Sequence, residues 1–140
     1  MKLNVLIVDD CQVMRMVIRR TVELCDFEIN EIIEAENGKE ALDLIRKKEF
    51  GLIVADLNMP VMSGAEMLAH IKLDPATCRI PILTVSAESN DVKVDIVRDL
   101  GTEFLHKPFA PEALRNKVLK LLNKDSITNK ESGFMVNGEM

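Results

Sequence analysis

Three carboxylates, a hydroxyl and an amine each follow a short apolar segment of the 140-residue sequence: Asp9, Asp10, Asp56, Ser86 and Lys107. Carboxylates that gather in one place repel each other, and a hard divalent cation with oxygen ligands offsets this repulsion. The pattern holds acids and no histidine or cysteine in zinc-ligand spacing, so it favours Mg²⁺ over zinc. An ammonium and a hydroxyl beside the acids add a positive charge and a hydrogen-bond donor for an incoming anion. Together these groups predict a site that receives a phosphoryl group, with an acid as the nucleophile.

Each of these residues has an ordinary explanation when it is taken alone. The Asp9-Asp10 pair could be a solvated turn, Asp56 a helix-capping acid, Ser86 a loop hydroxyl and Lys107 a solvated charge. These explanations do not account for the common position of the five residues at the ends of apolar segments. In a parallel sheet the carboxyl ends of the strands gather at one edge, where open α/β sheets bind their ligands.

The segments that must position these residues alternate between two hydrophobic patterns. Largely apolar runs, typical of strands buried on both faces, occupy residues 5–8, 51–55 and 80–85, and short strand-like segments occupy residues 31–35 and 103–106. Helical periodicity follows these runs over about residues 12–24, 38–45, 64–73, 91–100 and 111–123. Five strands that alternate with five helices predict an α/β fold, in which helices cover both faces of one parallel sheet.

The helical patterns also predict caps and buried faces. The expected N-terminal caps are Asn37, Ser63 and either Ser89 or Asn90. In the first helix the expected inward stripe is Val13, Val17 and Leu24, with Arg15 and Arg19 off it. In the fourth helix the expected inward stripe is Val92, Ile96 and Leu100.

Composition limits the class of protein. The chain is 47% hydrophobic and 29% charged, which is ordinary for a soluble globular domain. Residues 1–123 are predicted to form that domain and residues 124–140 a flexible tail, because periodicity ends there. No apolar run approaches the roughly 20 residues of a membrane helix, and the net charge of -5 argues against a nucleic-acid partner. Three scattered cysteines form no disulfide framework, which favours a cytoplasmic location.

Four motifs in this order resemble the receiver domain of two-component response regulators over about residues 3–123: Val8-Asp9-Asp10, Asp56-Leu57-Asn58-Met59-Pro60 with Ser63-Gly64, Val85-Ser86-Ala87, and Lys107-Pro108-Phe109. Met14-Arg15, Asn58 and Ala87-Glu88 make the chain especially similar to single-domain chemotaxis regulators, which are called CheY-like. The resemblance implies a flavodoxin-like, doubly wound sheet of five parallel strands in the order 2-1-3-4-5, with five helices.

The resemblance also implies a role for each motif residue. Asp56 would be the phosphoacceptor, and Mg²⁺ would be held by Asp9, Asp10, Asp56 and the main-chain carbonyl of Asn58. Lys107 would contact the phosphoryl oxygens, and Lys107-Pro108 would be the family's cis peptide bond. The switch pair would be Ser86 and Phe104, although chemotaxis regulators typically carry tyrosine at the second position. Asn58 and Glu88 would tune dephosphorylation.

A receiver domain of this kind implies a signalling switch and not a metabolic enzyme. Its expected partners are a histidine kinase, a downstream target on the face of the fourth helix and fifth strand, such as the flagellar motor switch, and a phosphatase. No nucleic acid or membrane partner is expected, and the chain would be a cytoplasmic monomer.

Three other functions stay open at this point. A phosphorelay intermediate would pass its phosphoryl group to a histidine phosphotransfer protein. A small-molecule phosphatase with an aspartyl nucleophile would need a second acid two residues after Asp56, where the sequence has Asn58. A pure interaction module would not need the acids and the lysine at all.

Overall fold

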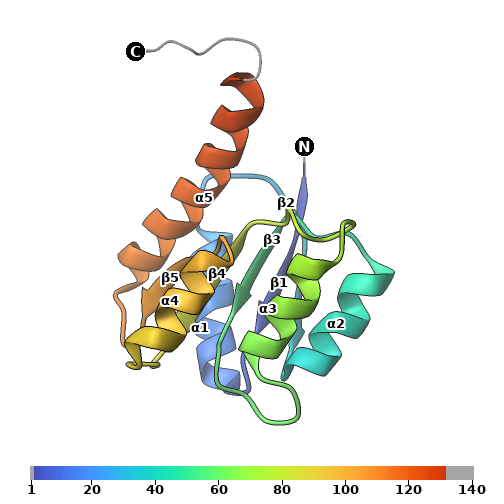
Figure 1. Cartoon of the computed structure of the whole chain (residues 1–140). Coiled ribbons are helices and arrows are strands. Elements are labelled where there is room, and N and C mark those ends of the chain that lie inside the picture. Colours follow the sequence, from blue (N-terminus) through green and yellow to red (C-terminus); the bar gives the residue numbers. More distant parts are fainter. Residues whose placement is uncertain (1, 132–140) are drawn as a thin grey trace.

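The computed structural model describes residues 2–131, and the side chains of residues 2–123. Strands and helices alternate along the whole of this part of the chain (Figure 1). The strands are β1 (Leu3–Val8), β2 (Ile29–Ala35), β3 (Leu52–Ala55), β4 (Ile82–Ser86) and β5 (Glu103–His106). The helices are α1 (Gln12–Glu23), α2 (Gly38–Lys47), α3 (Gly64–Leu73), α4 (Asp91–Asp99) and α5 (Pro111–Glu131). All neighbouring strands pair in parallel, in the order β2-β1-β3-β4-β5, so the predicted fold class and strand order are confirmed.

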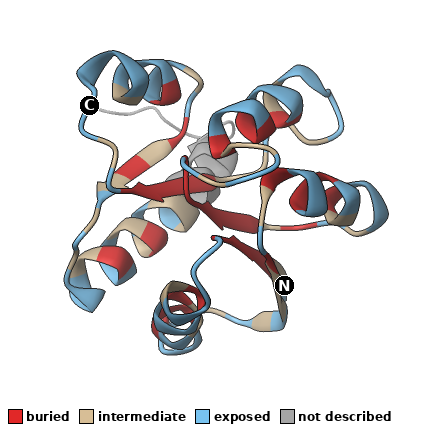
Figure 2. Cartoon of the chain, turned by 90° about the horizontal axis from the view of Figure 1, so that it is seen from below, coloured by how far each residue is buried: buried red, intermediate tan, exposed pale blue. Residues whose placement is uncertain are grey.

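The sheet forms the centre of the molecule and separates two apolar clusters (Figure 2). Alternate residues of each strand point to opposite faces, so Leu6 and Val8 pack with α2, α3 and α4, whereas Val5 and Ile7 pack with α1 and α5. Strands β3 and β4 are buried along their whole length. Because both faces of the sheet are covered, these strands read as continuous apolar runs in the sequence.

Short polar side chains start three of the helices as predicted. Asn37 accepts from the Glu40 N–H at 2.8 Å, and Ser63 accepts from the Glu66 N–H at 3.2 Å. Asn90 caps α4, which decides between the two candidates that the sequence offered. Gly101 follows α4 with a φ of 84°, a left-handed conformation that glycine adopts without a steric penalty.

The predicted inward stripes of two helices are wrong. In α1 the core-facing residues are Ile18, Thr21 and Val22, whereas Val13 is 67% and Leu24 is 74% exposed. Helix α1 carries apolar residues on more than one face, so its periodicity fits two orientations, and packing selects the other one. In α4, Val97 faces the core, Val92 and Ile96 are exposed, and only Leu100 of the predicted three packs against the core.

The last helix is longer than predicted. It continues past its expected end at Asn123 to Glu131, so residues 124–131 of the predicted tail are helical. Their polar sequence lacks an apolar stripe but contains no glycine or proline, and extending an existing helix costs little. Residues 132–140 lie outside the described residues. None of the described helices is both long and apolar enough to cross a bilayer.

Candidate functional site

The three predicted acids come together at the carboxyl edge of the sheet. Asp9 and Asp10 directly follow β1, and Asp56 directly follows the neighbouring strand β3. Each contributes a carboxylate oxygen to a group whose atoms all lie within 4.8 Å of one another. Asp9 and Asp56 are buried, at 1% and 6% exposure, whereas Asp10 is exposed. The cluster therefore opens to solvent on the Asp10 side.

Lys107 joins this cluster from the end of β5. Its ammonium nitrogen lies 2.9 Å from Asp9 Oδ2 and 3.5 Å from Asp56 Oδ2. The following peptide bond, Lys107-Pro108, is cis, as the family resemblance implied. The Lys107 main-chain N–H donates to the Ser86 carbonyl at 2.9 Å, which fixes the end of β5 against the end of β4. Within the described side chains, Lys107 is the cation that forms ion pairs with these acids.

The charges of the cluster shift two pKa values. Burial raises the pKa of Asp56, the ammonium of Lys107 opposes this change, and the neighbouring Asp9 carboxylate adds to it, so the net shift is upward. Burial acts to lower the pKa of Lys107, but its hydrogen bond to Asp9 and the charges of both acids raise it overall. The site contains three carboxylates and only one paired ammonium, so negative charge remains in excess.

The donor set fits Mg²⁺. Three carboxylates converge from two strand ends, only one of them is exposed, and the single paired ammonium does not offset their charge. A small divalent cation with oxygen ligands and bound waters would relieve this imbalance. Asp9, Asp10 and Asp56 are the side chains that would hold it. The predicted fourth contribution, from the main-chain carbonyl of Asn58, stays a prediction.

Ser86 lies at the end of β4 and is fully buried. Its hydroxyl oxygen accepts from the Glu88 main-chain N–H at 3.2 Å, and the Asn58 side-chain amide lies 3.5 Å from the same oxygen. The Asn58 main-chain N–H donates to Asp56 Oδ1 at 3.3 Å. Asn58 therefore connects the predicted phosphoacceptor with the predicted switch hydroxyl through its backbone and its side chain.

Glu88 lies beside the same group. Its carboxylate accepts from the Asn90 N–H at 3.0 Å and pairs with Lys93 at 3.6 Å. The Asn90 N–H, together with the charge of Lys93, lowers the pKa of Glu88. The two residues that were predicted to tune dephosphorylation, Asn58 and Glu88, thus both neighbour Ser86.

Phe104, the predicted switch aromatic, lies within β5 opposite Thr84 of β4. Its ring is buried, at 7% exposure, and packs in the same cluster as Val97 of α4. The guanidinium of Arg98 lies over the ring, 5.8 Å from its centroid, which is within the range of a cation–π contact. The ring therefore links β5 to α4 on the side of the sheet where that helix packs.

The loop between β3 and α3 depends on Gly64. A Cβ atom at this position would lie 1.9 Å from the Asp56 carbonyl oxygen and 2.7 Å from the Leu57 Cα. The Gly64 N–H donates to the Leu57 carbonyl at 2.8 Å, which draws the start of α3 against the end of β3. Only a residue without a side chain allows the start of α3 to approach the backbone of Asp56 and Leu57 this closely.

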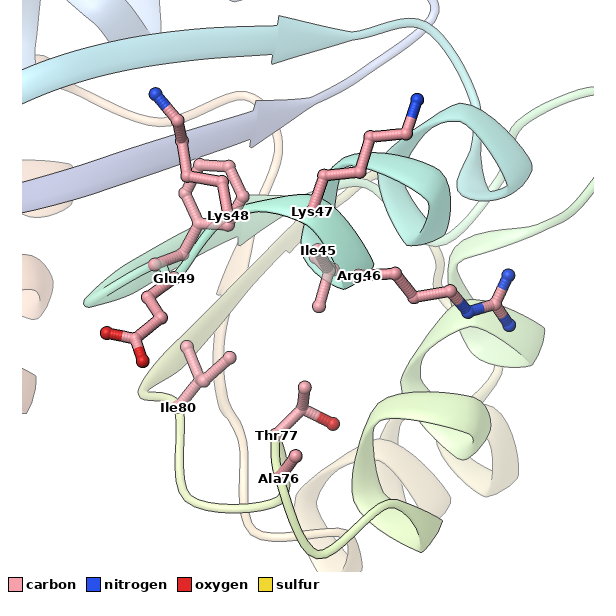
Figure 3. Close-up of a pocket in the computed structure, with 9 residues that line it drawn as sticks. Ile45, Arg46, Lys47, Lys48, Glu49, Ala76, Thr77 and Ile80 are labelled. Atoms are coloured by element: carbon pink, nitrogen blue, oxygen red, sulfur yellow. The ribbon is translucent and has the colours of Figure 1, made fainter.

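Within the described residues, Asp9, Asp10 and Asp56 form the one group of acids, cysteines or histidines that could hold a metal ion. One cavity of about 430 Å³ lies between the end of α2 and the segment before β4, and the charged ends of Lys47 and Lys48 point away from Thr77 and Ile80 there (Figure 3). Another, of about 470 Å³, lies between α3 and α4 and is mostly apolar, with Asn58 and Glu88 among its lining residues.

Sequence reasoning missed Arg15 and Glu34. Arg15 was expected on the outer face of α1, but it is 9% exposed and its Nη1 donates to the Asp9 carbonyl at 2.7 Å. Glu34 of β2 accepts from Arg15 and from Arg19, each at 2.8 Å. The signal was present in the helical spacing, since residues 15, 18 and 22 share one face of a helix.

Comparison with known proteins agrees with this geometry. The response regulator receiver domain matches residues 5–119. The chain is 30% identical to chemotaxis protein CheY-3 of Vibrio cholerae serotype O1 over 123 residues, which are 87% of this chain and 93% of that protein. It is 31% identical to the chemotaxis protein CheY homolog of Campylobacter jejuni over 126 residues, covering 89% and 95% of the two chains.

Solved structures show the same fold. CheY4 of Vibrio cholerae, a chemotaxis response regulator, superposes with a TM-score of 0.75 at 30% identity and covers 86% of this chain and 99% of its own. The receiver domain of AraT from Geobacillus stearothermophilus gives a TM-score of 0.80 at 26% identity, with coverage of 92% and 99%. The chain therefore belongs to the response regulator receiver domain family, whose members are phosphorylation-activated signalling switches of two-component systems.

Proposed function

We propose that the chain accepts a phosphoryl group from a histidine kinase on Asp56 and then changes its affinity for a target protein in chemotaxis. The observation that carries this proposal is the convergence of three carboxylates and Lys107 at one sheet edge. The similarity to proteins named for chemotaxis supports the pathway. The chain acts as a cytoplasmic monomer that catalyses its own phosphorylation and dephosphorylation, not as a metabolic enzyme.

The transfer step uses the carboxylate of Asp56 as the nucleophile. A carboxylate oxygen attacks phosphorus in line, so an oxygen–phosphorus bond forms while the phosphorus–nitrogen bond to the kinase histidine breaks. Lys107, whose ammonium lies 3.5 Å from Asp56 Oδ2, stabilises the phosphoryl oxygens as charge develops on them. When bound by Asp9, Asp10, Asp56 and the Asn58 carbonyl, Mg²⁺ supplies further charge neutralisation.

The kinase approaches along the exposed apolar part of α1. Val13 and Met16 are 67% and 60% exposed, and they lie on the helix that follows directly after the acid pair. Exposed apolar side chains beside a reactive group give a partner protein a surface to dock on. Docking there would place its phosphohistidine over the solvent side of the acid cluster.

The signal passes from Asp56 to Ser86 and Phe104. The Ser86 hydroxyl, now near the Asn58 amide, turns to donate to a phosphoryl oxygen on Asp56. Phe104, packed with α4, adjusts its ring to that movement, and the face of α4 and β5 changes its affinity for the target. The exposed Val92 and Ile96 of α4 provide apolar contact area on this face for a target such as the flagellar motor switch protein. A coupling of about 1–3 kcal/mol is enough to change partner affinity usefully.

Hydrolysis of the phosphoryl group on Asp56 resets the switch, and a phosphatase partner would accelerate this step. Asn58 lies near the Ser86 oxygen through its side-chain amide and Glu88 through its main-chain N–H. Their side chains would flank the path of a water that attacks a phosphoryl group on Asp56. Their polar side chains orient that water for attack on phosphorus and so set the lifetime of the phosphorylated state.

The test is to incubate the full chain with Mg²⁺ and a labelled small phosphodonor. We expect a single phosphoryl group per chain, its loss in Asp56→Ala, and unchanged labelling in the matched control Asp43→Ala, which removes an exposed acid on α2. Labelling that survives in Asp56→Ala, or many turnovers of donor that favour a phosphatase, would contradict the proposal.

The chemotaxis part is tested with the phosphorylated protein. We expect it to bind the flagellar motor switch protein of its source organism more tightly than the unphosphorylated protein does. Equal binding of both forms, together with rapid transfer of the phosphoryl group to a histidine phosphotransfer protein, would show a relay intermediate instead.

A further inference from the structure

Arg15 is a charged residue of α1 whose side chain is turned into the protein. It is only 9% exposed, and two of its nitrogen atoms have fixed partners. Nη1 donates to the main-chain carbonyl of Asp9 at 2.7 Å, and Nε pairs with Glu34 Oε1 at 2.8 Å. The other oxygen of Glu34 pairs with Arg19 at 2.8 Å. Because the guanidinium is held on two sides, its position is fixed by the fold.

Asp9, the residue that Arg15 contacts, has a partner for each of its polar groups. Its main-chain N–H donates to the Ala35 carbonyl at 3.1 Å. Its carboxylate accepts from the Cys11 N–H at 2.9 Å and from Lys107 at 2.9 Å. The contact with Arg15 completes the set by fixing the carbonyl. Asp9 is therefore held from β2, α1 and β5 together.

Asp10 is in the opposite situation. Its side chain is exposed, and within the described residues no hydrogen bond holds its carboxylate. The direction in which it leaves the backbone depends on the peptide unit that joins it to Asp9, because that unit is planar and rigid. The carbonyl of this same peptide unit is the group that Arg15 holds at 2.7 Å.

We propose that Arg15 is a positioning residue for the phosphoryl-transfer site, because it fixes the Asp9–Asp10 peptide unit and so aims Asp10 at the metal. The inference rests on the proposed function, in which Asp9, Asp10 and Asp56 hold Mg²⁺. Arg15 contacts the main chain of Asp9 and the side chain of Glu34, not the carboxylates that would hold the metal. Glu34 orients the guanidinium for this task, which connects β2 to the site. Residues that orient metal ligands change metal affinity by about tenfold to a hundredfold when they are replaced.

The competing explanation is that Arg15 and Glu34 only tie α1 to β2. Arg19 distinguishes the two, since it also pairs with Glu34 but donates to the Ile32 carbonyl at 3.1 Å, away from the acids. Losing Arg19 removes an ion pair of the same kind and leaves the Asp9 carbonyl held. Lysine at position 15 keeps the charge but cannot reproduce the planar fork that reaches both Asp9 and Glu34.

The experiment measures Mg²⁺ affinity by calorimetry on the full chain for wild type, Arg15→Lys, Arg15→Gln and the control Arg19→Gln. It also records the backbone amide shift of Asp10 by NMR without metal. We expect both Arg15 variants to bind Mg²⁺ at least about tenfold more weakly than wild type. The chemical shift of the Asp10 amide should change in both Arg15 variants. Arg19→Gln should resemble wild type in Mg²⁺ affinity and in this chemical shift.

The inference is overturned if the Arg15 variants bind Mg²⁺ as tightly as wild type and Arg19→Gln do. Should Arg15→Gln fail to fold, Arg15→Lys decides by the same criterion. A wild-type protein that binds no Mg²⁺ would overturn the proposed function and this inference together, whereas unchanged variants beside a binding wild type would overturn the inference alone.

Discussion

The ammonium nitrogen of Lys107 lies 2.9 Å from Asp9 Oδ2, in a contact where Asp9 is 1% and Lys107 17% exposed at the side chain. The same nitrogen lies further, at 3.5 Å, from the carboxylate of Asp56. The lysine is thus anchored on Asp9 and remains within reach of Asp56, the proposed phosphoacceptor.

Replacing Lys107 with methionine should strongly destabilise the metal-free protein. The change leaves two buried carboxylates without their counter-charge, and breaking such a pair costs about 3 kcal/mol or more. Urea unfolding followed by far-UV circular dichroism measures the loss, because the chain has no tryptophan or tyrosine for fluorescence. Lys107→Arg, which keeps the charge, should lose less, and an unchanged unfolding midpoint in Lys107→Met would contradict the assigned ion pairs.

Asp56→Asn should make the metal-free protein more stable at neutral pH. Because the pKa of Asp56 is raised from 3.8 in the folded protein, folding favours its protonated form, and this contribution is lost as the pH rises through the folded pKa. Removing the charge should therefore raise the free energy of unfolding at pH 7 and change it little below pH 3.8.

Thermal unfolding of Asp56→Asn and wild type with increasing Mg²⁺ provides the second half of that comparison. The ion should stabilise wild type more than the variant, because it binds the folded carboxylates. A variant that is less stable than wild type without metal would argue against excess negative charge in the cluster.

Glu34→Gln should destabilise the protein in a pH-dependent way. Burial acts to raise the pKa of Glu34, but its hydrogen bonds and charge contacts with Arg19 and Arg15 outweigh this and lower it from 4.5. Its stabilisation is therefore present above pH 4.5 and is lost as the pH falls through the lower folded pKa. With a side chain that is 29% exposed, the loss at pH 7 should be about 1 kcal/mol. A difference between the two proteins that stays constant from pH 7 to acid would show that these ion pairs contribute nothing.

Gly64→Ala should disturb the loop that carries Asn58. The added methyl group would lie 1.9 Å from the Asp56 carbonyl oxygen, so the backbone must shift, at a cost of about 1–3 kcal/mol. We expect slower phosphorylation of Asp56 as well as lower stability. Ala65→Ser, at the next and exposed position, should change neither quantity. Wild-type rates in Gly64→Ala would mean that this close approach is unimportant for the site.

Much of this site could be predicted because strand ends are readable in the sequence. The strand-like segments before Asp9-Asp10, Asp56 and Lys107 indicate where each strand stops, and parallel pairing then brings those residues to one edge. The caps at Asn37 and Ser63 were equally local, since each depends on residues three positions apart.

The helix faces could not be predicted in the same way. The apolar residues of α1 lie on more than one face. The spacing therefore groups Arg15 with Ile18 and Val22, but packing against β2 and α5 decides that this face is the inward one. A buried arginine is also unexpected from composition, because its place depends on Glu34 of a distant strand and on the Asp9 carbonyl. The end of α5 was missed for a different reason, since a polar helix that leaves the core carries no periodic signal.

The most direct test of the account is to identify the acceptor side chain. The full chain is phosphorylated with a small phosphodonor and Mg²⁺, the acyl phosphate is reduced with borohydride to an alcohol, and the modified residue is located by peptide mass spectrometry. The account predicts reduction at Asp56 and no modification in Asp56→Asn. Modification at Asp9 or Asp10, or an unmodified chain under conditions that saturate the site with Mg²⁺, would contradict it.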